Sequence, residues 1–224
     1  MKIELIETKD GSHSLLVPEL NETYHSTHGA VTESQYVFIE KGLNYILEKK
    51  PKKINILEVG FGTGLNALLT CLESTQFGIG VHYTTLETYP LPEEITDKLN
   101  FSQYIDHPKA SEFLREIHAA SWGSSSAVAE HFILQKENQS IQEFSKEAGT
   151  YNLVYFDAFA PSRQPEMWDI SIFQKLNLLL ADNGVLVTYC AQGQFKRDLK
   201  SCGFEVEKLP GPPGKAEMTR AVKR

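Results

Sequence analysis

The sequence contains no long hydrophobic run and only three cysteines. None of its apolar stretches approaches the roughly 18 residues that a membrane span needs, and the N-terminal MKIELIETKD lacks the apolar core of a secretory signal. Cys71, Cys190 and Cys202 are far apart and form no CxxC or Cys/His spacing. We therefore expect no metal site and a reducing compartment, the cytoplasm.

Positive charge is also scarce, with 22 Lys and Arg against 29 Asp and Glu in 224 residues, a net charge of -7. This balance argues mildly against a nucleic-acid partner. Residues 196–224 are the exception, because they carry eight Lys or Arg and only four Asp or Glu. Such a basic tail is either a surface that faces phosphates or an ordinary solvated face, and composition alone leaves both open.

Strand and helix patterns alternate along most of the chain. Apolar strand patterns occur at residues 54–59, 81–87, 131–137, 151–157, 184–190, 204–209 and 216–222, and helical patterns at 34–50, from 65 onward, and 171–181. This order predicts an α/β, Rossmann-like fold with a mostly parallel seven-stranded sheet and helices on both faces. Asp10-Gly11 predicts a small N-terminal β-hairpin. We expect residues 1–33 to form this extension and residues 34–224 the main domain.

A glycine-rich turn, EVGFGTGLN, follows the first strand of the main domain at residues 58–66. The dinucleotide fingerprint GxGxxG would need glycine at position 65, where Leu65 stands. A phosphate-binding P-loop is excluded too, because no Lys-Ser/Thr pair follows. A glycine turn alone is equally consistent with close packing of a helix on a strand. Its neighbours therefore decide which ligand it holds.

Two carboxylates accompany the turn at the ends of neighbouring strands. Glu87 is placed where a carboxylate accepts hydrogen bonds from two ribose hydroxyls, although an ordinary surface acid is the alternative. Glu58 ends a buried strand, where a carboxylate is costly unless it is paired. An ammonium group, such as that of S-adenosylmethionine, would satisfy it. This ligand has no pyrophosphate, so the missing third glycine is not needed, and we predict S-adenosylmethionine as the cofactor.

A second motif, DAFAPSRQPEMW, begins where the strand at 151–157 ends. Its Asp157 reaches the same sheet edge as Glu58 and Glu87, so the three acids are expected to face one pocket. The small, stiff stretch Ala158–Pro161 suits the wall of a substrate site. The alternative is a loop that caps and packs the core. Asp157 and the stretch after it are therefore candidates for the wall of a substrate site.

Together these motifs are similar to one protein family. EVGFGTGLN, TLETYPL, YFDAFAPSRQPEMW, FKRDLKSCGFEVEKLPGPPGKAEM and the N-terminal YHSTHGAVTESQYVF resemble the methyltransferase part of MnmC and its stand-alone counterpart, MnmD. The resemblance runs from Tyr24 to Met218. It implies methylation of the amine of 5-aminomethyl-2-thiouridine, the wobble uridine of certain tRNAs, to give 5-methylaminomethyl-2-thiouridine.

The resemblance also implies roles for individual residues. For the cofactor these are Tyr24, Glu58, Gly60, Gly62, Thr63, Gly64, Asn66 and Glu87. Asp157 is the implied catalytic residue, and we expect Phe159, Pro161, Lys196, Arg197 and Lys215 to contact the substrate. The family commonly has Gly-Asp after the third strand, where this chain has Lys136-Glu137. We expect Glu137 to take over the contact with the adenine amine.

The resemblance also concerns partners. In MnmC a flavin-dependent oxidoreductase follows the methyltransferase, and this chain stops at Arg224. We therefore expect the stand-alone form, with tRNA as partner and the aminomethyl group supplied by a separate oxidoreductase or by upstream enzymes. Six cations suggest a track for the tRNA: Lys196, Arg197, Lys200, Lys208, Lys215 and Arg220.

Two other functions share the expected fold. An aminopropyltransferase of the spermidine-synthase type also has an Asp-containing loop after the fourth strand, but it needs further acids to hold a polyamine. Ser162-Arg163-Gln164 offers none here. A non-catalytic S-adenosylmethionine-binding or RNA-binding module is disfavoured by the intact acids at three strand ends.

Overall fold

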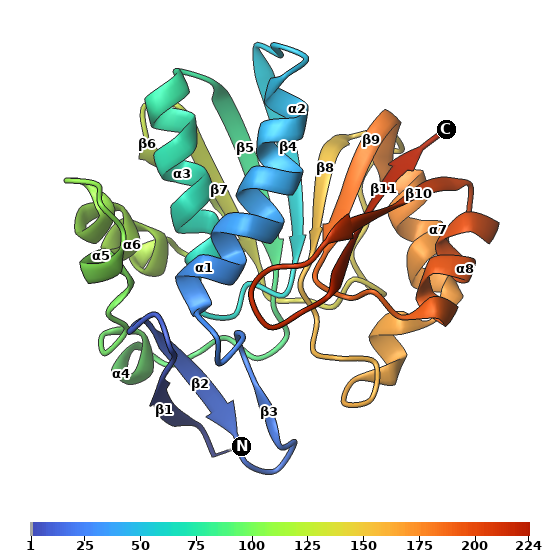
Figure 1. Ribbon diagram of the computed structural model, residues 1–224. Coiled ribbons are helices and arrows are strands. Elements are labelled where there is room, and N and C mark those ends of the chain that lie inside the picture. The colour runs from blue at the N-terminus through green and yellow to red at the C-terminus, as the bar shows by residue number, and fades with distance from the viewer. Residues whose placement is uncertain (1) are drawn as a thin grey trace.

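A computed structural model describes residues 2–224, and a central eight-stranded sheet organises them (Figure 1). Its strands are β4 (Lys53–Val59), β5 (Gly80–Leu86), β6 (Ser125–Ala129), β7 (Phe132–Glu137), β8 (Tyr151–Phe156), β9 (Leu180–Thr188), β10 (Phe204–Pro210) and β11 (Glu217–Lys223). The strand order is β10-β11-β9-β8-β4-β5-β7-β6. The five strands from β9 to β7 pair in parallel. The α/β fold with a mostly parallel sheet is thereby confirmed.

The predicted number of seven strands is wrong by one. The additional strand is β6, which pairs antiparallel with β7 at the edge of the sheet and carries a register shift between Ala127 and Ala129. Its sequence, SSAVA, buries only Val128, so it lacks the apolar alternation by which a strand is recognised. At the opposite edge, β11 pairs antiparallel with β9, and β10 with β11.

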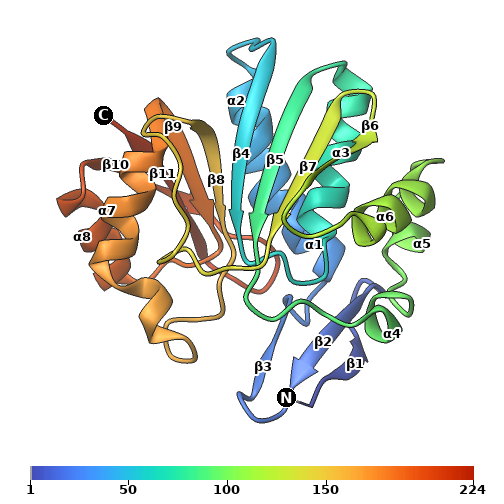
Figure 2. The same ribbon diagram turned by 180° about the vertical axis from the view of Figure 1, so that it is seen from behind.

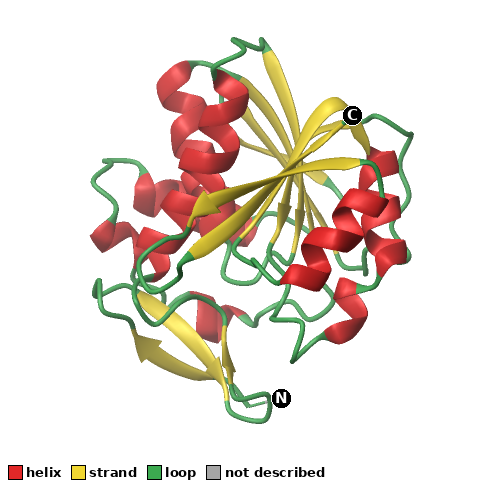
Figure 3. Cartoon of the chain, turned by 45° about the vertical axis from the view of Figure 1, so that its right-hand side comes forward, coloured by secondary structure: helices red, strands yellow, loops and turns green. Residues whose placement is uncertain are grey.

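Helices cover both faces of the sheet, as predicted (Figures 2 and 3). On one face lie α3 (Leu65–Phe77), α6 (Ala110–Ala119) and a continuous helix made of α1 (Ala30–Ser34), the π-helix η1 (Gln35–Leu43) and α2 (Asn44–Leu47). On the other lie α7 (Ile170–Leu179) and α8 (Gly193–Ser201). Along β4, Ile54 and Ile56 belong to the first core, and Leu57 and Val59 to the second. This alternation is the period of two that a strand imposes.

Three short helices complete the main body: α4 (Glu93–Thr96), α5 (Phe101–Tyr104) and the 3₁₀ helix η2 (Pro165–Trp168). Among residues 2–224, no helix combines the length and the apolar character that a membrane crossing requires.

The N-terminal segment forms a separate antiparallel sheet of three strands, β1 (Glu4–Glu7), β2 (His13–Val17) and β3 (Glu22–Thr23). The predicted hairpin joins β1 and β2. This sheet lies beyond the carboxyl ends of the parallel strands (Figures 1 and 2). The expected division between residues 33 and 34 falls inside α1, which begins at Ala30. The small sheet is fastened there, because the Thr32 N–H and hydroxyl donate to the Asp10 carboxylate at 3.0 and 2.8 Å.

Candidate functional site

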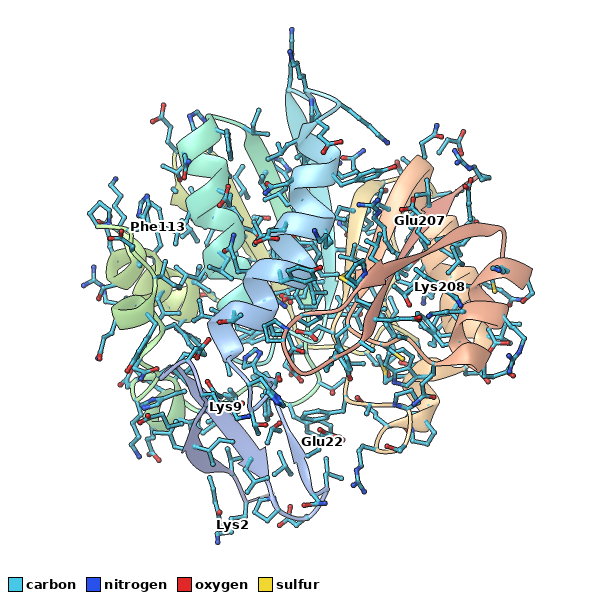
Figure 4. The ribbon with its side chains drawn as sticks, in the orientation of Figure 1. Lys2, Lys9, Glu22, Phe113, Glu207 and Lys208 are labelled. Atoms are coloured by element: carbon cyan, nitrogen blue, oxygen red, sulfur yellow. The ribbon has the colours of Figure 1, made fainter. Side chains whose placement is uncertain are left out.

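A cavity of about 620 Å³ lies at the carboxyl ends of the parallel strands, in the size range of small-molecule sites. Its walls come from residues 59–63, 65 and 66 at and after the end of β4, 86–89 at the end of β5, 157–160 after β8 and Tyr189 after β9. Residues 22–28, at the end of the N-terminal sheet, supply a further wall, and Glu22 is labelled there in Figure 4. The strand order reverses at β4, because β5 lies on one side and β8 on the other. Ligands of open α/β sheets bind at such a reversal.

The glycine turn permits close approach of two other segments. At Gly60, φ is +96° and a Cβ atom would lie 2.6 Å from the Asp157 carbonyl oxygen. At Gly62, φ is +51° and a Cβ atom would lie 3.1 Å from the Tyr24 ring. Both glycines and Thr63 line the cavity, whereas Gly64 does not. The turn leads into the N-terminus of α3, whose first N–H groups have no partner within the helix.

Glu87 faces the cavity and is held by the backbone. The Gly62 N–H donates to its Oε2 at 3.1 Å, and the Tyr89 N–H donates to its Oε1 at 2.9 Å. Each carboxylate oxygen retains a lone pair for a ligand hydroxyl. Tyr24 lines the same cavity, and burial, together with the nearby Glu87 charge, raises the pKa of Tyr24 to about 12. Its hydroxyl therefore keeps its proton at neutral pH.

Glu58 is fully buried and does not line the cavity. The Asn66 amide donates to its Oε1 at 3.1 Å, and the Thr85 hydroxyl donates to its Oε2 at 2.7 Å. The expectation that a ligand ammonium pairs with Glu58 is therefore wrong, because two side chains of the protein do so. Burial raises the pKa of Glu58 to about 8, which favours the protonated carboxyl at neutral pH.

Asn66 connects this buried carboxyl with the cavity. Its Nδ2 also donates to Asp157 Oδ2 at 2.9 Å, so one amide group holds two carboxyl groups. The Asn66 side chain lines the cavity and is only 2 % exposed, and its Oδ1 has no hydrogen-bond partner among residues 2–224. A buried acceptor without a donor is costly. A ligand that carries an ammonium or amide N–H would satisfy it.

Asp157 lies on the cavity wall, as predicted. Burial raises the pKa of its carboxyl to about 7, with a contribution from the Glu33 charge and an opposing one from the Asn66 hydrogen bond. A carboxyl group in this range can exchange a proton at physiological pH. The loop after it is held in place, because the Tyr189 hydroxyl donates to the Ala158 carbonyl at 2.8 Å. Phe159 lines the cavity beside Tyr24, with an edge-to-face contact of 5.2 Å between ring centroids.

Glu137 and Pro161, which were also predicted, lie outside the cavity. Glu137 instead accepts hydrogen bonds from Gln135 at 2.6 Å and Gln139 at 3.4 Å, and residues 139–142 line the wall in its place. Pro161 lines an adjoining groove. The loop after β7 forms this part of the wall, and Glu137 at the end of the strand does not. Strand pattern alone does not reveal this difference.

The six expected tRNA contacts fall into three groups. Lys196 is 7 % exposed and pairs with Glu217 at 2.6 Å, and Arg220 pairs with Glu207 at 2.6 Å, so neither is free to meet a polyanion. The expectation is wrong for these two residues. Arg197, Lys200 and Lys208 are exposed. Figure 4 shows Lys208 on β10. Lys215 lines the cavity.

Three polar wall residues stand out among those that were not predicted: Glu33, His25 and Tyr189. Glu33 is buried and accepts a hydrogen bond from Lys215 Nζ at 2.6 Å. His25 Nε2 lies 2.7 Å from the Thr63 hydroxyl, and burial lowers the pKa of His25 to about 4. Both belong to the YHSTHGAVTES segment, which gives no local sign that it folds over the sheet edge. Tyr189 follows β9 at that edge, and this position was a signal that could have identified it.

Comparisons with known proteins identify the family of this chain. The profile of the S-adenosyl-L-methionine-dependent methyltransferase family Methyltransf_30 matches residues 110–224. The tRNA 5-methylaminomethyl-2-thiouridine biosynthesis bifunctional protein MnmC of Pseudoalteromonas atlantica is 30% identical over 92% of this chain and 32% of its own length. The chain thus spans about a third of the length of the curated relatives it matches. The resemblance inferred from the motifs is confirmed.

Solved structures give the same result. The crystal structure of MNMC2 from Aquifex aeolicus superposes with a TM-score of 0.81 and 26% identity, covering 100% of this chain and 70% of that one. Spermidine synthase from Thermotoga maritima, at a TM-score of 0.55 and 10% identity over 100% of this chain and 72% of that one, shares the fold alone.

Proposed function

This chain belongs to the S-adenosyl-L-methionine-dependent methyltransferases, and we propose that it methylates the amine of 5-aminomethyl-2-thiouridine at the wobble position of tRNA. The product is 5-methylaminomethyl-2-thiouridine. The observation that carries the proposal is Asp157, a carboxyl group with a pKa of about 7 on the wall of a cavity that also holds Glu87. The printed names of the curated relatives, which concern biosynthesis of this nucleoside, supply the substrate class.

The residues of the cavity fit S-adenosylmethionine, which supplies a methyl group bound to a positively charged sulfur. Glu87 accepts the ribose hydroxyls with the lone pairs that Gly62 and Tyr89 leave free. The unpaired Oδ1 of Asn66 accepts the ammonium group, and the N-terminus of α3 faces the carboxylate. Tyr24 and Thr63 complete the wall.

Asp157 acts on the amine. An alkylammonium has no lone pair to attack with, so the nitrogen must lose a proton before or as it attacks. The Asp157 carboxylate accepts an amine hydrogen and thereby directs the lone pair, which combines orientation with general-base assistance. The Asn66 hydrogen bond and the Tyr189-held loop fix the direction of the carboxylate. Phe159 packs against the substrate from the same wall.

The aminopropyltransferase alternative is less favoured. It shares the fold alone, whereas the motifs and the relatives support methyl transfer. The polar part of the loop after β8, Ser162-Arg163-Gln164, contributes no acid for a polyamine. Glu33 is already paired with Lys215.

The proposal also covers the tRNA contacts, the origin of the aminomethyl group and the location of the protein. Arg197, Lys200 and Lys208 are exposed cations on the side of the molecule that carries α8 and β10, and they are the candidate phosphate contacts. The enzymes that form the aminomethyl group act before this methyl transfer. The cytoplasm, where tRNA is modified, is the proposed location.

The test is a methyl-transfer assay on tRNA from cells that lack the modification. With S-adenosylmethionine, the purified chain should convert the aminomethyl nucleoside to one heavier by a CH₂ group, as nucleoside mass spectrometry detects. With putrescine and decarboxylated S-adenosylmethionine, no spermidine should form. Spermidine formation, or the absence of any methylated nucleoside, would contradict the proposal.

A further inference from the structure

A second hollow adjoins the cavity. This groove, of about 460 Å³, shares Ala160, Tyr189 and Lys215 with the cavity. Its remaining wall comes from Pro161 after β8, residues 190–192 after β9, and residues 216–217 at the start of β11. The shared residues make the two hollows neighbours across a common wall.

We propose that this groove binds the nucleotide that adjoins the reacting nucleoside in the RNA chain. The inference rests on the proposed function and adds a second subsite to it. Along the sheet edge, the order of strands is β5, β4, β8, β9 and β11. Glu87 follows β5, Asp157 follows β8, and the groove lies around the ends of β9 and β11. The cofactor is held at β4 and β5, on one side of Asp157. An RNA chain whose reacting amine reaches Asp157 therefore continues on the other side of that residue, toward β9 and β11, where the groove lies.

The charges of the groove suit a phosphodiester. Its one acidic residue among residues 2–224 is Glu217, and Lys196 neutralises it at 2.6 Å. At the common wall, Lys215 Nζ donates to Glu33 at 2.6 Å and lies 3.9 Å from the centre of the Tyr189 ring. An ammonium group has three hydrogens. Lys215 therefore retains donors for a phosphate that passes between the two hollows.

The walls of the groove suit the rest of a nucleotide. Pro161, Ala191 and Ala216 present small apolar surfaces to a ribose or a base. Gln192 offers an exposed amide on the same wall. The exposed Arg197 side chain lies next to Gly193, the residue after Gln192. A Cβ atom built on Gly193 would lie 3.4 Å from the Arg197 guanidinium. A second cation thus stands beside the wall for the next phosphate.

Charge reversal on the groove wall tests the inference. Gln192→Glu places a carboxylate there at a position just before α8, where an acid is compatible with the helix. The substrates are an anticodon stem-loop that contains 5-aminomethyl-2-thiouridine and the free nucleoside. We expect kcat/KM on the stem-loop to fall roughly tenfold, mostly through KM, as for one unfavourable charge at a phosphate contact. S-adenosylmethionine affinity, measured by calorimetry, should not change.

Gln103→Glu is the matched control, because it adds the same charge at an exposed position of α5, on the opposite side of the molecule from α8 (Figure 1). It should leave unchanged the activity on the stem-loop, the activity on the free nucleoside and the affinity for S-adenosylmethionine. Ala191→Phe, which fills the groove without a charge, should reproduce the loss on the stem-loop. With the free nucleoside as substrate, the methylation rate of Gln192→Glu should equal that of the wild type, whether or not the wild type accepts the nucleoside.

The outcomes separate the two proposals. A wild-type enzyme that methylates neither substrate contradicts the proposed function, and the groove assignment with it. An active wild type with an unaffected Gln192→Glu variant overturns the groove alone. Equal losses on both substrates also overturn it, because the variant would then act on the cavity and not on a neighbouring nucleotide.

Discussion

The amide nitrogen of Asn66 donates to the carboxylate of Asp157 at 2.9 Å, joining the first turn of α3 to the end of β8. The two residues are 91 positions apart. The same nitrogen lies 3.1 Å from Glu58, which is fully buried. The direction of the proposed base is therefore set by a residue of the glycine-turn motif, and two walls of the cavity, the glycine turn and the loop after β8, are linked by a hydrogen bond.

Replacing Asp157 by asparagine should abolish most of the turnover. Asp157→Asn keeps the shape but removes the proton acceptor, so the single-turnover rate should fall roughly 10²–10⁴-fold. The wild-type rate should rise with pH through about 7, because the deprotonated carboxylate is the active form, and the variant should lack that rise. S-adenosylmethionine affinity should change little. Asp106→Asn, at an exposed position, is the control. A near wild-type rate would mean that Asp157 is structural.

Removing the Glu87 carboxylate should weaken cofactor binding. Glu87→Ala leaves both ribose hydroxyls without a charged acceptor and frees the Gly62 and Tyr89 N–H groups. We expect a loss of roughly 1.5–3 kcal/mol in S-adenosylmethionine binding by calorimetry. Glu93→Ala removes an exposed acid of α4 and should have no effect. Unchanged affinity in the Glu87 variant would refute the ribose assignment.

Glu58 should make stability depend on pH. Its pKa is raised from 4.5 to about 8 in the folded protein, so between these values the folded state binds more protons than the unfolded state. The stabilisation is complete below about pH 4.5 and is lost as pH rises through about 8, by at most about 1.4 kcal/mol per pH unit. Glu58→Gln has no such proton to lose. Its free energy of unfolding should therefore decrease less with pH.

Urea unfolding at several pH values between 5 and 9 measures this difference. Glu48→Gln, at an exposed position directly after α2, should keep the wild-type slope. Some slope should remain in Glu58→Gln, because the pKa of Asp157 is raised as well. Identical slopes in the wild type and Glu58→Gln would show that Glu58 is not the buried titrating group.

RNA binding should depend on salt through exposed cations such as Arg197 and Lys200, and not through the buried Lys196. Neutralising Arg197 and Lys200 together should reduce the slope of log affinity against log salt, by about one unit per lost phosphate contact. Lys196→Met should instead lower stability, because it leaves Glu217 without its partner. Lys52→Ala and Lys53→Ala, at the amino end of β4, are the controls. An unchanged slope in the Arg197/Lys200 double variant would place the RNA elsewhere.

The sequence by itself determined the order of strands and helices and which side chains reach the carboxyl edge of the sheet. Apolar alternation identifies a strand locally, and the residue that follows each parallel strand must lie at one edge. Glu87, Asp157 and the glycine turn could therefore be assigned to one site from strand pattern alone. The edge strand β6 was not predicted, because short, mostly exposed strands show little apolar alternation.

Only the tertiary structure decided which of those side chains face the cavity. Glu58 stands opposite Thr85 on β5 and Tyr155 on β8, and this register buries it where its sequence position suggested a ligand contact. Lys215 meets Glu33 across 182 residues, and Lys196 meets Glu217 across 21. Such pairs depend on how distant segments pack, and no local pattern encodes that. The same packing brings the N-terminal sheet over the strand ends and completes the cavity.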